Sequence, residues 1–175
     1  MKGAQRMAEN TIIRHVNMGK LLTGRGNQRL VAVLGSCVGL AFLWPNGQRC
    51  ALAHCVLPHA PPEEGGMGAR YVTQAVPSML TAMGVTAAER TEIDVVLAGG
   101  ASMFGPGSAL LQVGRQNIVA ALSTLQQFGL RVACSDLGGY GGRQLIVDCS
   151  SYTCFVRPII APASEAPVPP QLLRR

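Results

Sequence analysis

The stretch LVAVLGSCVGLAFLWPNGQRCALAHCVL, residues 30–57, decides the fold. It contains three apolar runs, residues 30–34, 38–44 and 50–57, and all three are rich in residue types that favour strands. Between the second and third runs lies Pro45-Asn46-Gly47, a strong turn signal. The pattern therefore predicts an antiparallel hairpin of residues 38–44 and 50–57, with Cys37 at the entrance to its first strand.

The same hairpin predicts which side chains meet. Pairing around the 45–47 turn puts the partner of a residue near position 38 in the low fifties, so we expect His54 beside Cys37. Side chains alternate between the two faces of a strand. One face of the second strand should carry Cys50, Leu52, His54 and Val56, and the other Ala51, Ala53 and Cys55.

Outward from the hairpin, the chain divides into three parts. We expect an irregular basic arm over residues 1–29 with a possible first strand at 11–16, a domain over residues 30–157, and a disordered tail over 158–175 that is rich in Pro and Ala. Helical spacing of apolar residues predicts helices at 67–83, where Pro77 would cause a kink or a break, and at 114–128. Further strands are expected at 93–98, 130–135, 144–148 and 152–157. The result is an α+β class, with mixed sheets packed against helices.

Composition excludes several functions. The chain is 48% hydrophobic and 14% charged, its apolar runs are too short to span a bilayer, and its first residues lack the features of a secretory signal. These features predict a cytoplasmic protein without membrane insertion, in which the six cysteines are reduced thiols. The net charge of +6 comes from the two ends, and basic residues do not cluster with aromatic ones, which disfavours nucleic-acid binding.

Cys37 has three possible roles: core residue, metal ligand or nucleophile. A nucleophilic cysteine needs a neighbouring base, and of the three histidines His54 is the one that the hairpin brings near. The small Gly35-Ser36 turn would also expose backbone N–H groups, near Gly35, Ser36 and Val38, where an oxyanion forms. A buried structural pair of Cys37 and His54 is the alternative.

Two further patterns, one of Cys and His and one of glycine pairs, bear on a metal or phosphate site. Cys50, His54, Cys55 and His59 have the composition of a zinc site, but an extended strand would scatter them, so we expect neither a metal nor a cofactor. The pairs Gly99-Gly100 and Gly138-Gly139 lack the ending of a phosphate-binding loop. We expect them to let backbone lie close to Cys37 or to a docking helix, with Met103, Phe104 and Tyr140 either exposed there or in the core.

Several motifs together carry a resemblance to a known family. They occur in order over about residues 11–157: LGSCVGL (34–40), LAHCVLP (52–58), ARYVTQAV (69–76), LAGGASMF (97–104), VGRQNIVAALSTLQQFGL (113–130) and SDLGGYGGR (135–143). In these motifs the chain resembles the CheD chemoreceptor glutamine deamidases of bacterial chemotaxis.

The resemblance implies a fold, an activity and partners. It implies sheets inside and helices outside, similar to toxin-type cysteine deamidases, with Cys37 as nucleophile and His54 as general base. The implied enzyme is a protein-glutamine glutaminase that converts glutamine side chains on receptor helices to glutamate without a cofactor; some members also hydrolyse glutamyl methyl esters. Chemoreceptor helices and a CheC-type phosphatase are the implied partners. The candidate surface for them comprises Gly99, Gly100, Ser102, Met103, Phe104, Gly138, Gly139 and Arg143.

One residue departs from the family pattern. The family has a threonine six residues before the cysteine that orients the histidine, and this chain has Val31 there. Ser36, Ser102 or Thr153 are candidates to replace the hydroxyl. The alternative function is a catalytically weak or inactive adaptor that binds receptor or phosphatase helices.

Overall fold

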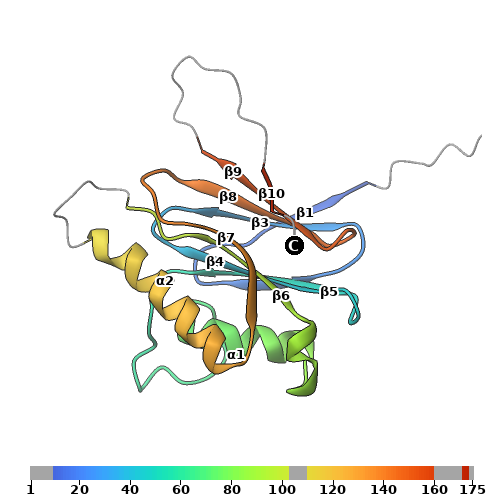
Figure 1. The fold of residues 1–175 in the computed structure, drawn as a ribbon, viewed down its shortest axis with the longest axis horizontal. Coiled ribbons are helices and arrows are strands. Elements are labelled where there is room, and N and C mark those ends of the chain that lie inside the picture. The colour runs from blue at the N-terminus through green and yellow to red at the C-terminus, as the bar shows by residue number, and fades with distance from the viewer. Residues whose placement is uncertain (1–9, 103–109, 160–170, 174–175) are drawn as a thin grey trace, which may run out of the picture.

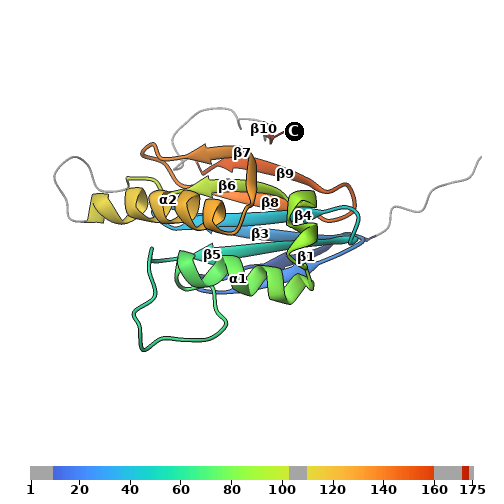
Figure 2. The same cartoon turned by 60° about the horizontal axis from the view of Figure 1, so that its bottom comes forward.

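Two five-stranded sheets and two helices form three layers in the computed structural model, which describes residues 10–102, 110–159 and 171–173 (Figures 1 and 2). We use the name central sheet for the one between the helices and the other sheet, which is the outer sheet. The central sheet has the order β2 (Leu21–Gly24), β5 (Arg49–Cys55), β4 (Val38–Trp44), β6 (Asp94–Gly99) and β7 (Arg131–Leu137). The outer sheet has the order β1 (Ile12–His15), β3 (Gln28–Leu34), β8 (Arg143–Asp148), β9 (Thr153–Pro158) and β10 (Gln171–Leu173).

Both helices cover the same face of the central sheet (Figure 1). Helix α1 (Val72–Met83) packs on β5 and β2, and α2 (Leu110–Gln127) packs on β4 and β7; a short 3-10 helix, Ala88–Glu92, precedes β6. Helix α1 begins later than its apolar spacing predicts and continues through Pro77. It ends at Gly84, a left-handed residue whose N–H bonds back to the last turn. No helix in the described ranges is long and apolar enough to cross a membrane.

The predicted hairpin is confirmed, including its register. Strands β4 and β5 are antiparallel around the 45–48 turn, and Gly39 lies opposite His54. Strand β4 is buried along its whole length because β5 and β6 flank it and layers cover both of its faces. This accounts for its continuous apolar sequence, which shows no alternation.

The two faces of β5 belong to two different cores. Ala51, Ala53 and Cys55 pack with the helices, whereas Cys50 and Leu52 pack between the sheets with residues of β3 and β8. The predicted alternation along this strand is therefore confirmed, and His54 and Cys55 point to opposite sides. The composition that suggested zinc is spread over both faces of the sheet.

The two ends of the chain differ from the sequence prediction. The predicted first strand is confirmed as β1, but residues 12–24 also form β2, so they supply an edge strand to each sheet and are part of the domain rather than an arm. Within the tail, residues 171–173 pair with β9, and the expected disorder is wrong for them. The local sequence of residues 171–173 carries no strand signal of its own. The segment is a strand because pairing with an existing sheet edge stabilises it.

Candidate active site

Cys37 lies where the chain crosses from one sheet to the other. Strand β3 ends in the outer sheet at Leu34, β4 begins in the central sheet at Val38, and residues 35–37 form the bend between them. The Cys37 side chain is 9% exposed and packs in the core between the sheets. A crossing made of small residues thus places a thiol at the rim of the sandwich.

His54 comes to the same place from β5. It lies opposite Gly39 of β4, and Cys37, in the bend just before β4, packs in the core between the sheets, the side that His54 faces. Gly39 has no side chain to lie between them. The register therefore brings His54 beside the bend that carries Cys37, and the catalytic pairing of the two side chains stays a prediction.

The backbone of Val16 orients the imidazole. Nδ1 of His54 lies 3.1 Å from the Val16 carbonyl oxygen, which can only accept, so Nδ1 carries the hydrogen and Nε2 the lone pair. Nε2 is buried and has no hydrogen-bond partner among the described residues. His54 is thus held as a neutral base whose accepting nitrogen is unoccupied.

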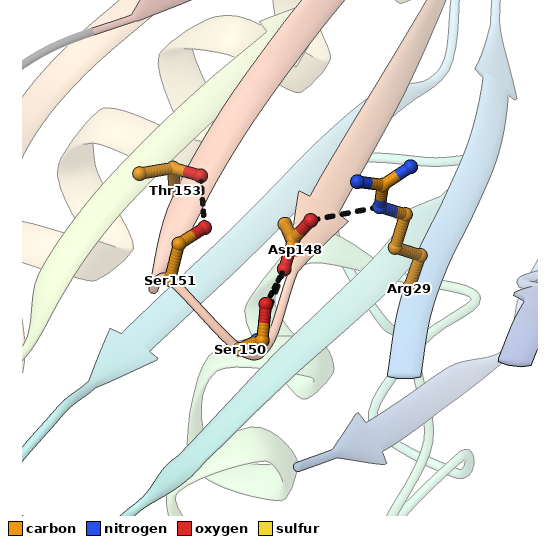
Figure 3. Close-up of polar contacts among 5 residues, drawn as sticks. All are labelled: Arg29, Asp148, Ser150, Ser151 and Thr153. Atoms are coloured by element: carbon orange, nitrogen blue, oxygen red, sulfur yellow. Dashed lines mark hydrogen bonds and ion pairs between the residues drawn. The ribbon is translucent and has the colours of Figure 1, made fainter. Parts of the chain in front are cut away.

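The Val16 segment is itself held in place by backbone bonds. The Val16 N–H donates to Val31 O (2.8 Å), Gly19 N–H donates to His54 O (2.8 Å), and His54 N–H donates to Lys20 O (2.9 Å). The main-chain carbonyl of Val31 therefore helps to position His54 by holding the Val16 segment. This contact does not depend on the Val31 side chain. Thr153 does not replace the family's threonine, because its hydroxyl pairs with Ser151 in the turn between β8 and β9 (Figure 3).

Burial keeps both reactive groups neutral at rest. Desolvation raises the pKa of the Cys37 thiol, with a backbone hydrogen bond opposing the shift. Burial lowers the pKa of His54, and the bond to Val16 opposes it. At neutral pH the pair is a thiol and a neutral imidazole, which suits general-base removal of the thiol proton.

The glycine loops fix the backbone around Cys37. Gly100 N–H donates to Cys37 O (2.8 Å), and Ala101 N–H donates to Gly35 O (2.8 Å). A side chain at Gly99, whose φ is +103°, would overlap the Cys37 carbonyl oxygen. The second loop supports the first, since Gly138 N–H donates to Gly99 O (2.9 Å) and Ser102 N–H to Gly139 O (2.8 Å). The expected close approach to Cys37 is confirmed for Gly99-Gly100, whereas Gly138-Gly139 bonds to that first loop and not to Cys37.

Asn117 of α2 is a site residue that the sequence analysis missed. It is fully buried, and its Nδ2 donates to Ser36 O (3.1 Å) and Val56 O (3.0 Å). It therefore ties the crossing that carries Cys37 to the chain beyond His54. The signal was present in the sequence: Asn117 is a polar residue on the apolar face of α2, one turn from Ala120 and Ala121, which are buried in the helix-side core.

Other predicted site residues lie elsewhere. Arg143 is buried, and its guanidinium donates to the carbonyl oxygens of Asp136 and Gly138, so it holds the loop and is not exposed for a partner. Tyr140 is exposed. Met103 and Phe104 lie outside the described residues.

The Val38 N–H is part of the hydrogen-bond ladder between β4 and β5. Along a strand, successive residues direct their N–H and C=O groups to opposite neighbouring strands. Those of His54 bond to the β2 side, so those of the next residue, Cys55, are directed toward Val38 on β4. The Val38 N–H therefore belongs to the ladder, and the expectation that it is an oxyanion donor needs correction. The N–H groups of Ser36 and Cys37 donate to no other backbone group in the described part of the chain.

A cavity of about 480 Å³ reaches His54 from the surface. It is lined by His15, Val16, Asn17, Met18, Val31, Val33 and His54. Met18 and Val33 are exposed at its mouth, so the entrance is largely apolar.

Comparison with known proteins gives the family of this chain. Residues 56–158 match the family model described as "CheD chemotactic sensory transduction". This chain belongs to the CheD family. A Bdellovibrio bacteriovorus protein named probable chemoreceptor glutamine deamidase CheD is 36% identical over 75% of this chain and 85% of its own length. Relatives with corresponding names from Ruegeria sp. (36% identity; 78% of this chain, 87% of the relative) and Methanococcus maripaludis (34%; 81% and 92%) are similar over most of the chain.

Proposed function

We propose that this CheD-family chain is a protein-glutamine glutaminase that converts glutamine side chains of chemoreceptors to glutamate. The observation that supports this most is the orientation of His54, which lies beside the bend that carries Cys37: its Nδ1 is bonded to Val16 O, and its buried Nε2 has no partner among the described residues. The relatives' names, which state glutamine deamidation of chemoreceptors, supply the substrate.

The first half-reaction forms a thioester. Nε2 of His54 takes the thiol proton as the Cys37 sulfur attacks the amide carbon, and the carbonyl oxygen becomes an oxyanion. The N–H groups of Ser36 and Cys37 are the donors placed to stabilise it. The imidazolium then protonates the amide nitrogen, the C–N bond breaks, and ammonia leaves.

The second half-reaction hydrolyses that thioester. Nε2 of His54 takes a proton from water, the hydroxide adds to the thioester carbon, and the C–S bond breaks. The sulfur regains a proton from the imidazolium, and the product is glutamate. Each turnover consumes one water and releases one ammonia, and the new carboxylic acid loses its proton, which the ammonia takes up as ammonium, so the receptor gains one negative charge.

The test uses a receptor cytoplasmic fragment and mass spectrometry of its peptides. The wild-type protein should convert specific glutamines to glutamates, and Cys37→Ala should abolish the conversion. Cys134→Ala, a change on β7, is the matched control and should keep the activity. If the wild-type protein binds the fragment without converting it, the enzyme proposal is overturned and the adaptor function remains. Binding to a CheC-type phosphatase is a separate prediction of the resemblance.

A further inference from the structure

A second cavity, of about 320 Å³, lies at the opposite end of β5 from His54. It is lined by Arg14, Thr23, Gly24, Arg25, Gln28 and Arg49. Every charged residue in this lining is an arginine. Arg49 begins β5, and His54 is five residues along the same strand, so about 17 Å of strand separates this arginine cavity from the proposed active site.

Two of the guanidinium groups are anchored by backbone carbonyls. Arg14 donates to Thr23 O (2.9 Å) on β2, and Arg49 donates to Met83 O (3.1 Å) at the end of α1. A guanidinium has five N–H donors, so each anchored group keeps others for a ligand. The anchoring reduces the rotamer entropy that ligand binding would cost.

No described carboxylate neutralises these arginines. The ion pairs among the described residues involve Arg29, Arg131 and Arg143 instead. Asp148 is close to the cavity in the chain, because the next residue, Cys149, donates its N–H to Gln28 O (3.0 Å). Both oxygens of Asp148 are already used: one accepts from Arg29 (2.7 Å), and the other accepts from Ser150 (Figure 3).

We propose that the arginine cavity binds a phosphate group, either as inorganic phosphate or as the phosphate of a small phosphomonoester. Guanidinium forks match phosphate oxygens in a bidentate manner, and three of them compensate a dianion. The cavity has the volume of a site for a small ligand. Thr23 and Gln28 add neutral hydrogen-bonding groups at its wall.

The test is calorimetric titration of the full chain at constant ionic strength. The probes are inorganic phosphate, ribose 5-phosphate and, as a carboxylate control, glutarate. We expect saturable binding of one phosphate-bearing ligand per chain and an accompanying rise in Tm, with no comparable binding of glutarate. Tighter binding of ribose 5-phosphate points to a phosphomonoester, and tighter binding of phosphate points to the free anion.

Arg25→Gln is the decisive variant, because the described hydrogen bonds of Arg25 are made by its main chain, with Gln28, so the change should leave the fold intact. It should weaken binding by about tenfold, which corresponds to about 1.4 kcal/mol. Arg157→Gln, an exposed arginine of β9 with the same loss of charge, should leave binding unchanged. Equal weakening in both variants, no saturable phosphate binding, or equal binding of glutarate would overturn the proposal.

Discussion

At the residue scale, the account depends on how His54 is oriented. A carbonyl on a separate segment fixes its tautomer, and this carbonyl belongs to Val16. No sequence pattern identifies such a bond, because every residue has a carbonyl. Cys37 and His54 were predictable from hairpin pairing, whereas Val16 was not.

Val31→Thr tests whether the missing hydroxyl matters. Since the Nδ1 hydrogen is already donated to Val16, restoring the threonine should change kcat/KM for receptor deamidation by less than about threefold. Steady-state kinetics on the receptor fragment measures this. An increase of tenfold or more would show that Val16 alone orients the imidazole poorly.

The acid side of the pH profile reports on His54. The base must be neutral to accept the thiol proton, and burial lowers the pKa of His54, so activity should persist to lower pH than an ordinary histidine of pKa about 6.5 allows. Activity is therefore lost only as pH falls through the lowered value. The measurement is kcat/KM against pH, and an acid limb centred at or above about 6.5 would contradict the buried neutral base.

At the element scale, the crossing between β3 and β4 is held by donors from other elements. The first glycine loop bonds to the Gly35 and Cys37 carbonyls, and Asn117 of α2 bonds to that of Ser36. Most of the strands were predictable from runs of apolar residues. β2 was not, because it is a short, half-buried edge strand that owes its place to pairing with β5.

Asn117→Ala should weaken both the fold and the reaction. It leaves the carbonyls of Ser36 and Val56 without their donor, which should lower the free energy of unfolding by about 1–3 kcal/mol. We expect kcat to fall while KM changes little, because the nucleophile is displaced and the surface is not. Gln116→Ala, on the exposed side of the same helix, is the control in denaturant unfolding and in kinetics. Equal effects of the two changes would contradict the role of Asn117 in holding the bend that carries Cys37.

Gly99→Ala and Gly138→Ala separate backbone strain from overlap. Both glycines have positive φ, so each change should cost about 1–2 kcal/mol. Only Gly99→Ala also drives a methyl group into the Cys37 carbonyl. The Tm from thermal unfolding and the deamidation rate should therefore fall further for Gly99→Ala. Similar losses in the two variants would show that the bend at residues 35–37 shifts to accommodate the methyl group.

At the scale of the whole molecule, the proposed active site exists only because two sheets face each other. The outer sheet supplies β3 and the start of the Val16 segment, and the central sheet supplies His54. The layered α+β class could be predicted from the order of strands and helices. The pairing of the chain ends could not, since it depends on contacts between residues far apart in sequence.

Leu145→Ala tests the contact between the sheets. Leu145 of β8 is fully buried, and its side chain reaches from the outer sheet toward Gly39 of the central sheet. Its truncation should lower the free energy of unfolding by about 2–5 kcal/mol. Ile146→Ala, on the other face of β8 and only partly buried, should cost less, and denaturant titration compares the two. A larger loss for Ile146→Ala would contradict the assignment of the inner face.

In the proposed reaction Cys37 forms a thioester with the receptor glutamine. The most direct measurement is acid quenching during turnover, followed by proteolysis and mass spectrometry of the Cys37 peptide. We expect a receptor peptide joined to Cys37 by a bond that hydroxylamine cleaves, and no such adduct in Cys37→Ala. Conversion of glutamine to glutamate at the wild-type rate by Cys37→Ala would contradict it.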